Sequence, residues 1–173
     1  MITELMNEAQ DPQDAILTIT YEYIPYMPPD FSTASSLWLD VGDCHSDVPV
    51  PNYTKSFELT MQPWTSTVSG RILTAISHIH DGGVRLDVLR NGYSVCRSVA
   101  TYGDPSGHKH HMLSMEMSHI SYMSTCYDVG RIKEGEEWAV KAHYDFEKHE
   151  PMLDGDGKPE DVMGITIVYL VED

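Results

Sequence analysis

Two histidines one residue apart, His78 and His80, are the side chains of this sequence best suited to hold a metal ion. They end the alternating segment 71–80, a pattern typical of a β-strand. Side chains two apart on a strand project from the same face, so the two imidazoles lie close enough together to chelate one ion. The pair alone leaves zinc, copper and a metal-free role open.

Met163 is the third candidate ligand. It stands at the start of the segment 162–171, the last expected strand, from which its thioether could face the histidine pair. Two imidazoles and a thioether form a soft donor set of low coordination number, which suits Cu(I) and, with added water, Cu(II). Zinc rarely accepts a thioether. The alternative for Met163 is ordinary core packing.

The histidine strand belongs to a series of segments that are rich in β-branched or aromatic residues and are bounded by Gly, Pro and Asp. These segments cover 15–23, 54–61, 71–80, 84–90, 93–99, 120–125, 138–145 and 162–171. Asn91-Gly92 predicts a hairpin with a type I′ turn, and 133–136 predicts another tight turn. No segment of ten residues has sustained helical periodicity, although residues 1–10 allow a short helix or a frayed tail. The sequence therefore predicts an all-β, antiparallel β-sandwich, jelly-roll-like, in a single domain.

The expected domain spans residues 15–173. Residues 1–14 are interpreted as an N-terminal tail or as residues foreign to the domain, and 25–53 as a long connection. In the segment 71–80, every second residue from Ile72 to His80 shares one face. Because this row is largely apolar, we expect it to face inward.

The composition limits the partners. The formal net charge is −16, with 27 acidic residues against 11 Lys and Arg, so a basic patch for nucleic acid or an anionic membrane is not expected. No apolar stretch approaches the roughly 20 residues of a membrane helix, and the first residues lack the pattern of a signal peptide. We expect neither nucleic acid nor membrane as a partner, and a protein that is not exported or whose leader was removed.

The three cysteines, Cys44, Cys96 and Cys126, include no Cys-x-x-Cys pair, so a structural zinc knuckle is not expected. Cys96 lies in an expected strand and Cys126 follows another. A disulfide between these two, with Cys44 as a lone thiol, is favoured, and it implies an oxidising compartment, secretory or extracellular. Three buried reduced thiols are the alternative.

Several motifs occur in a characteristic order: a His-x-His pair with a glycine-bearing turn, a hairpin, a loop histidine at His149, and a late Met before an Ile-x-Ile-x-Tyr strand. This order resembles the C-terminal copper domain of the copper type II, ascorbate-dependent monooxygenases, which include peptidylglycine α-hydroxylating monooxygenase and dopamine β-monooxygenase. The resemblance implies that His78, His80 and Met163 bind the copper at which oxygen is activated and substrate is hydroxylated. It also implies a small reductant such as ascorbate and an organic substrate of unknown identity.

Single-domain relatives of the stress-upregulated nodulin type, and their fungal counterparts, look closer still. The similar motifs lie between about residues 15 and 171 and are Trp38-Leu39-Asp40-Val41, His78-Ile79-His80-Asp81-Gly82-Gly83, Val95-Cys96, Met123-Ser124-Thr125-Cys126-Tyr127 and Val162-Met163-Gly164.

The sequence also departs from the two-domain monooxygenases. This chain has no room for their separate domain, in which three histidines hold a second copper. The peptide-hydroxylating members anchor the substrate carboxylate with an Arg two residues before the His pair and an Asn two residues after the Met. Those positions are Ile76 and Ile165 here, so a glycine-extended peptide is not expected as substrate.

A second cluster of histidines, His108, His110 and His111, is followed by Met112, Met115, Met117, His119 and Met123. Flexible His and Met tracts bind copper readily, so this tract is a candidate secondary copper site. An exposed loop that binds metal only at high concentration is the alternative.

Two further residues are candidates near the pair. His149 is a candidate third or fourth ligand in place of water, or a residue of a loop on the substrate side. Asp81 is placed to hydrogen-bond an imidazole, or to serve as a turn residue before Gly82-Gly83. 

Two functions are consistent with these patterns. One is a mononuclear copper oxidoreductase or monooxygenase that activates dioxygen or peroxide with an external reductant. The other is a copper-binding protein without turnover, for storage, delivery or stress protection.

Overall fold

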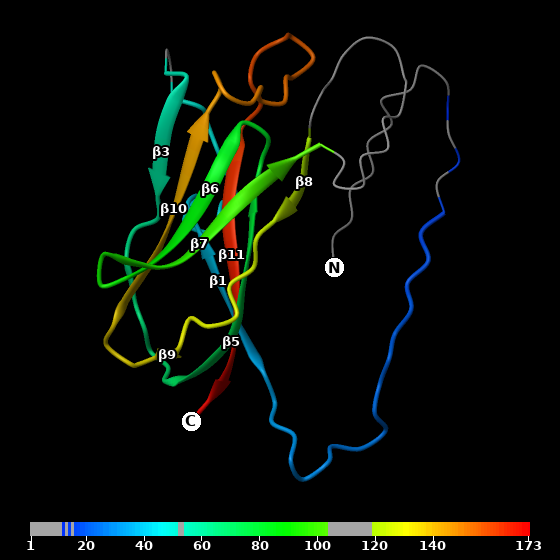
Figure 1. The fold of residues 1–173 in the computed structure, drawn as a ribbon, viewed down its shortest axis with the longest axis vertical. Coiled ribbons are helices and arrows are strands. Elements are labelled where there is room, and N and C mark those ends of the chain that lie inside the picture. The colour runs from blue at the N-terminus through cyan, green and yellow to red at the C-terminus, as the bar shows by residue number, and fades with distance from the viewer. Residues whose placement is uncertain (1–11, 13, 15, 52–53, 104–118) are drawn as a thin grey trace. The chain divides into compact units, whose positions relative to one another are not determined.

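The computed structural model describes residues 12, 14, 16–51, 54–103 and 119–173. The chain separates into two compact units, Met1–Phe31 and Ser32–Asp173. The strands among the described residues all lie in the second unit, where they form two packed antiparallel sheets (Figure 1). The predicted all-β, antiparallel sandwich is confirmed. None of the described residues forms a helix long and apolar enough to cross a membrane.

The first sheet carries the histidine strand. Its strands are β1 (Ser35–Asp40), β2 (Asp47–Val48), β5 (Gly70–Ile79), β9 (Arg131–Ile132) and β11 (Val162–Glu172). The order is β1-β11-β5-β9, and β2 also pairs with β11. β5 and β11 therefore lie at the centre of this sheet.

The second sheet packs against the first. Its strands are β3 (Ser56–Thr60), β4 (Trp64–Thr65), β6 (Gly83–Arg90), β7 (Tyr93–Tyr102), β8 (Ile120–Met123) and β10 (Glu137–Asp145). The order is β3-β10-β6-β7-β8, with β4 pairing β10. Between the sheets lies a core that includes Trp138, Tyr144, Leu86, Ile79 and Leu170, all buried. Burial of these apolar side chains is the main stabilising term of the fold.

The β6–β7 hairpin forms as predicted, because Asn91 and Gly92 adopt the positive φ angles of 50° and 81° that a type I′ turn requires. The turn at 133–136 also forms, with the Glu136 amide donating to the Lys133 carbonyl at 3.2 Å. Strand β1 lies within the segment 25–53, for which the sequence predicts a long connection, so this strand is a difference from the prediction. The suggested helix at 1–10 lies outside the described residues.

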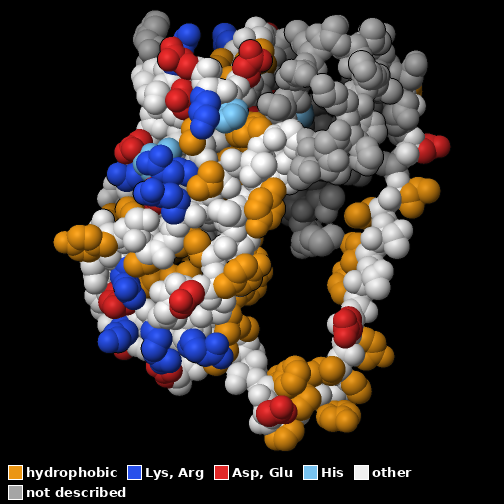
Figure 2. Space-filling view, viewed as in Figure 1, with side chains coloured by type: hydrophobic (Ala, Val, Ile, Leu, Met, Phe, Trp, Pro, Cys, Tyr) orange, Lys and Arg blue, Asp and Glu red, His pale blue; other side chains and the backbone are white. Residues whose placement is uncertain are grey.

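The predicted strand at 15–23 is wrong, since none of the described residues in this range is in a strand. Its composition is that of a strand, but a strand is stable only when neighbours hydrogen-bond to it and bury one face. Here Ile16, Tyr21 and Tyr23 are 92%, 78% and 82% exposed. Figure 2 shows the hydrophobic side chains that line this first unit.

The row from Ile72 to His80 does not face inward throughout, because a bulge interrupts β5. Tyr169 of β11 pairs with Thr74, whereas the next residue, Leu170, pairs with Ile72, so Leu73 is the extra residue. A bulge shifts the alternation of side chains by one. Before it Ile72 is buried, and after it Ile76 is exposed. The histidine pair therefore lies on the outer face of the sheet, which corrects the prediction.

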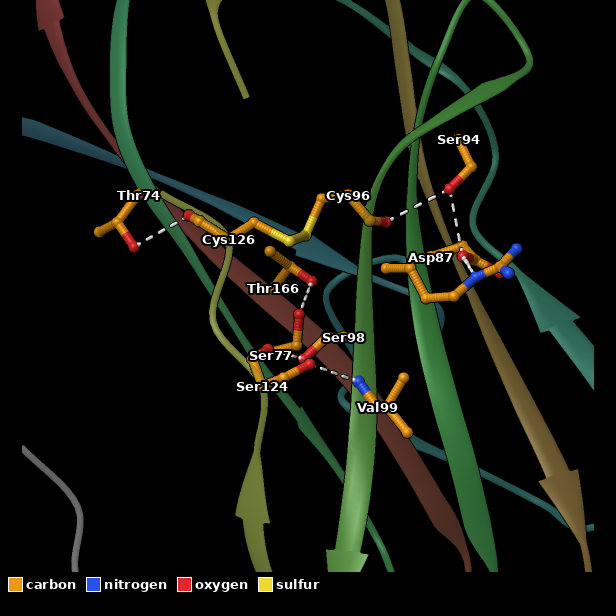
Figure 3. Close-up of a disulfide and its surroundings, with 11 residues drawn as sticks. Thr74, Ser77, Asp87, Ser94, Cys96, Ser98, Val99, Ser124, Cys126 and Thr166 are labelled. Carbon is orange, nitrogen blue, oxygen red and sulfur yellow. Dashed lines mark hydrogen bonds and ion pairs between the residues drawn. A yellow bond between two sulfur atoms is a disulfide. The ribbon is translucent and has the colours of Figure 1, made fainter. Parts of the chain in front are cut away.

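The disulfide between Cys96 and Cys126 is present, as the sequence favoured, with a Cα–Cα distance of 6.0 Å. Cys96 lies in β7 of the second sheet, whereas the backbone of Cys126 exchanges hydrogen bonds with Ala75 of β5 in the first sheet. Thr74 also donates its hydroxyl to the Cys126 carbonyl at 3.2 Å (Figure 3). The bond therefore links the two sheets beside the histidine strand, while Cys44 is free and exposed.

We predict that Cys96→Ser lowers the free energy of unfolding by about 3 kcal/mol, because the disulfide restricts the unfolded chain over a loop of this length. Urea denaturation followed by circular dichroism measures the change. Cys44→Ser is the matched control and should alter stability by less than about 0.5 kcal/mol. Equal stability of the Cys96→Ser and Cys44→Ser proteins would contradict the structural role of the bond.

Candidate metal centre

The pairing of β5 with β11 determines which side chains surround the histidines. His78 lies opposite Ile165, and Ile79 lies opposite Gly164. The His80 amide then donates to the Met163 carbonyl at 3.2 Å, so Met163 lies opposite His80. Directly opposed residues of antiparallel strands project from the same face. The structure thus places His78, His80 and Met163 on one outer face, at one end of the central strand pair.

The two imidazole rings stand close together but not parallel. Their centroids are 5.6 Å apart and their planes are inclined by 84°. Ring nitrogens at this spacing can reach one ion from two directions after small side-chain rotations. Chelation of a metal ion by this pair stays a prediction.

A backbone contact fixes which nitrogen of His80 is available to a metal. Its Nδ1 lies 3.0 Å from the carbonyl oxygen of Asp161. A carbonyl oxygen only accepts, so Nδ1 carries the hydrogen and Nε2 presents its lone pair. Metal-binding histidines typically donate their other ring N–H to such a carbonyl. The tautomer of His80 therefore fits a ligand that binds through Nε2.

His78 is electrostatically suited to the same role. Its side chain reaches solvent, but the surrounding protein desolvates the ring, and the neighbouring His80 adds charge repulsion. Both effects lower the pKa of His78, and the attraction of Asp81 offsets them only in part. A lowered pKa keeps the imidazole neutral near pH 7, which is the form that binds metals.

The turn after His80 is tightly packed. The Gly83 amide donates to the His80 carbonyl at 3.1 Å, and Gly82 has a φ of 84°. A Cβ at Gly82 would lie 2.4 Å from the ring of Phe146, so both conformation and space require glycine here. The turn carries the chain from β5 to β6, and hence from one sheet to the other.

A buried tyrosine holds the Met163 side of the site. Tyr144 of β10 donates its hydroxyl to the Met163 carbonyl at 2.5 Å, across the interior of the sandwich. Burial raises the pKa of the Tyr144 hydroxyl, so it stays protonated and remains a donor. This bond from the second sheet fixes the backbone that presents the thioether. The sequence alone gave no signal for it, because Tyr144 is 19 residues away in the chain.

Asp81 does hydrogen-bond an imidazole, but the imidazole is that of His119. The Asp81 Oδ2 lies 2.5 Å from Nδ1 of His119, and Oδ1 accepts the amide of Ile120 at 2.8 Å. Asp81 is also the second residue of the turn between β5 and β6. The carboxylate thus connects the histidine turn to the start of β8. Asp81 is a turn residue, which was one of the two sequence interpretations, and the imidazole that it contacts is that of His119.

His149 stacks on Tyr102, with ring centroids 3.7 Å apart and an interplanar angle of 7°. The Tyr102 hydroxyl donates to the Gly83 carbonyl at 2.8 Å. Desolvation and the charge of Lys148 lower the pKa of His149. The structure therefore places His149 against the turn through Tyr102, and its role as a further ligand stays a prediction.

One edge of the site is formed by a loop inserted into a strand. β1 ends with Asp40 opposite Ile165, and β2 resumes with Asp47 opposite Met163. The buried Asp40 carboxylate accepts the amides of Gly42 at 2.7 Å and Ser46 at 3.0 Å, which holds the intervening loop 42–46 in place. The candidate metal face is therefore bordered by a fixed loop.

A separate charged cluster occupies the outer face of the second sheet. Asp87 is buried there and bonds Arg97 at 2.8 Å, Arg85 at 3.2 Å and His143 at 3.0 Å. His143 also contacts Glu58 at 2.8 Å. Figure 2 shows Lys, Arg and His side chains gathered on this face. His143 thus belongs to an ionic network on the sheet opposite the histidine pair.

Within the described ranges, no group of three or more His, Cys, Asp or Glu side chains could hold a metal ion. Met163 is the candidate donor of another kind, and its role as a ligand stays a prediction. His108, His110 and His111 lie outside the described residues, so the secondary copper tract stays a prediction.

The stress up-regulated Nod 19 family (SURNod19) matches residues 34–169. The chain belongs to this family. The match covers both sheets and includes His78, His80 and Met163.

Two curated relatives are each 30% identical over 170 residues, which is 98% of this chain. They are the probable copper-dependent oxygenase M1 of a Phoma species and the probable copper-dependent oxygenase clz3 of Cochliobolus lunatus. The aligned region is 42% of the first relative and 53% of the second, so the chain spans about half the length of these proteins. No solved structure matches the chain.

We predict that the pKa of His78, measured by NMR titration of the metal-free protein, lies below the ordinary value of about 6.5. His80→Gln should raise this pKa, because it removes the repulsion by a protonated neighbour. His143→Gln, in the network on the other sheet, is the control and should leave the His78 titration unchanged. A pKa at or above the ordinary value would contradict the described environment of His78.

Proposed function

We propose that this chain binds copper on the outer face of β5 and β11 and that it serves as the copper domain of an oxygenase. The single observation that carries the proposal is the register of these strands, which brings two imidazoles and one thioether to the same end of one face. This soft set of three donors suits Cu(I) better than zinc. The names of the two fungal relatives support copper and an oxygenase activity.

In this proposal each residue has a separate task. His80 binds through Nε2 because Asp161 holds the hydrogen on Nδ1, and His78 is kept neutral by desolvation. Met163 presents a thioether from a backbone that Tyr144 fixes. Three protein donors on an open sheet face leave a coordination position accessible from solvent. Bound copper would supply the one-electron redox chemistry needed to activate dioxygen or peroxide.

The resemblance to the copper domain of the ascorbate-dependent monooxygenases supports a more specific form of the proposal. In that form an external reductant such as ascorbate returns the metal to Cu(I), and an organic substrate is hydroxylated. The chain spans about half the length of its curated relatives, and the oxygenase activity in their names is part of the proposal for this chain. The disulfide supports a secretory or extracellular location, where such bonds persist.

We predict that the metal-free protein binds one Cu(I) per chain and that His78→Ala weakens this binding at least about tenfold, through the loss of one ligand. Competition with a chromophoric Cu(I) chelator under anaerobic conditions measures the affinity. His143→Gln is the matched control because it removes an imidazole from the opposite sheet, and it should retain the affinity of the unchanged protein. Stoichiometric binding that survives His78→Ala at full strength would contradict the site.

Met163→Ile tests the thioether. Isoleucine keeps the apolar volume and the strand preference but removes the sulfur, so Cu(I) affinity should fall while Cu(II) affinity changes less. Equal losses for both oxidation states, or none, would return Met163 to a packing role. Oxygen uptake with ascorbate then separates the two functions. Copper-dependent uptake that His78→Ala abolishes supports the oxygenase, whereas tight copper binding without uptake supports a carrier.

A further inference from the structure

The outer face that holds the histidine pair continues into an uncharged strip along β5, β11 and the neighbouring strand β1. Trp38 of β1 lies opposite Ile167 of β11, which lies opposite Ile76 of β5. This row directly follows the row that contains His78, because Ile76 is two residues before His78. The next row consists of Ser36, Tyr169 and Thr74. We call the six residues of these two rows the apolar strip.

The apolar strip is open to solvent. Trp38 is 53% exposed, Ile76 is 46% exposed and Tyr169 is 37% exposed. None of its six residues is charged, although the chain carries a net charge of −16. These three large apolar side chains are exposed together beside the candidate metal ligands. Covering them with an apolar molecule would remove apolar surface from water, which is a favourable contribution to the binding free energy.

The indole of Trp38 is held in position. Its Nε1 donates to Oδ2 of Asp40 at 3.4 Å, and Asp40 is 2% exposed and anchored by the amides of loop 42–46. An aromatic surface that is already oriented loses little conformational entropy when a ligand stacks on it. Trp38 is therefore a preformed platform.

The spacing connects this platform to the metal face. Residues two apart on a strand are separated by about 6.6 Å, and neighbouring strands by about 4.8 Å. A molecule of the size of a bicyclic aromatic that rests on Trp38, Ile167 and Ile76 therefore has one edge beside His78. An ionic ligand would find no counter-charge in either row.

We propose that the apolar strip binds the organic substrate of the copper site, and that this substrate is an uncharged, largely apolar molecule of aromatic or alicyclic type. This inference rests on the proposed function, because it uses the copper site to choose a small molecule as the occupant. The contiguity of the strip with His78 is the observation that favours a substrate over a second copy of the chain.

The test uses indole as the probe. The two most exposed strip residues are changed together in Trp38→Thr/Ile76→Thr, which places a β-branched residue at both positions. The matched control is Tyr93→Thr/Tyr122→Thr, which removes two exposed aromatic side chains from the second sheet. Equilibrium dialysis of metal-free protein gives the Kd for indole. Relaxation of the indole protons in the presence of Cu(II)-loaded protein reports their proximity to the metal.

We expect the strip variant to raise the Kd for indole at least about tenfold, which corresponds to about 1.4 kcal/mol. The control should remain within about twofold, and copper affinity should be unchanged in both proteins. Cu(II) should enhance the relaxation of bound indole in the unchanged protein, and a diamagnetic Zn(II) load should not.

The outcomes separate the two proposals. If the strip variant loses its affinity for indole, the apolar strip is a binding surface. If, in the same experiments, His78→Ala does not weaken copper binding, the copper site is overturned while the strip is retained. Normal copper binding with indole affinity equal in all three proteins, or too weak to measure, would overturn the substrate class alone. A dimer in sedimentation experiments that the strip variant dissociates would show that a second copy covers this face, and would also overturn the proposal.

Discussion

The antiparallel register between β5 and β11 is the constraint on which the candidate site depends. It sets His78 opposite Ile165 and His80 opposite Met163, and so decides which donors meet. A slip of one residue would turn every side chain of one strand to the other face. The bulge at Leu73 acts in this way within β5, because it allows an apolar start of the strand to face the core and the histidines to face outward.

Contacts on the inner side of the sheet maintain this register. Ser77 and Thr166 share a buried hydroxyl hydrogen bond at 2.9 Å between the same two strands. A Cβ at Gly164 would lie 2.8 Å from the Cβ of Ala142 in the second sheet, so the two sheets approach closely beside Met163. The Cys96–Cys126 disulfide and the hydrogen bond from the Tyr144 hydroxyl to the Met163 carbonyl are two further links between the sheets. The outer face therefore presents its exposed side chains on a rigid support.

Local patterns in the sequence were sufficient for the fold class, the Asn91-Gly92 hairpin and the pairing of Cys96 with Cys126. They gave wrong predictions or none where residues that are distant in the sequence determine the local structure. Residues 15–23 have the composition of a strand but no strand forms among those described, and the outward direction of His78 follows from a bulge that only the pairing with β11 reveals. The partners of Asp81 and Met163, His119 and Tyr144, are likewise brought close only by the tertiary fold.

The central proposal is that two imidazoles and the thioether of Met163 hold copper. X-ray absorption spectroscopy of the Cu(I)-loaded protein tests it most directly, with Met163→Ile measured alongside. We expect scattering from two imidazoles and one sulfur, with the sulfur contribution absent in Met163→Ile. A spectrum without sulfur in the unchanged protein, or a sulfur contribution that persists in Met163→Ile, would contradict it.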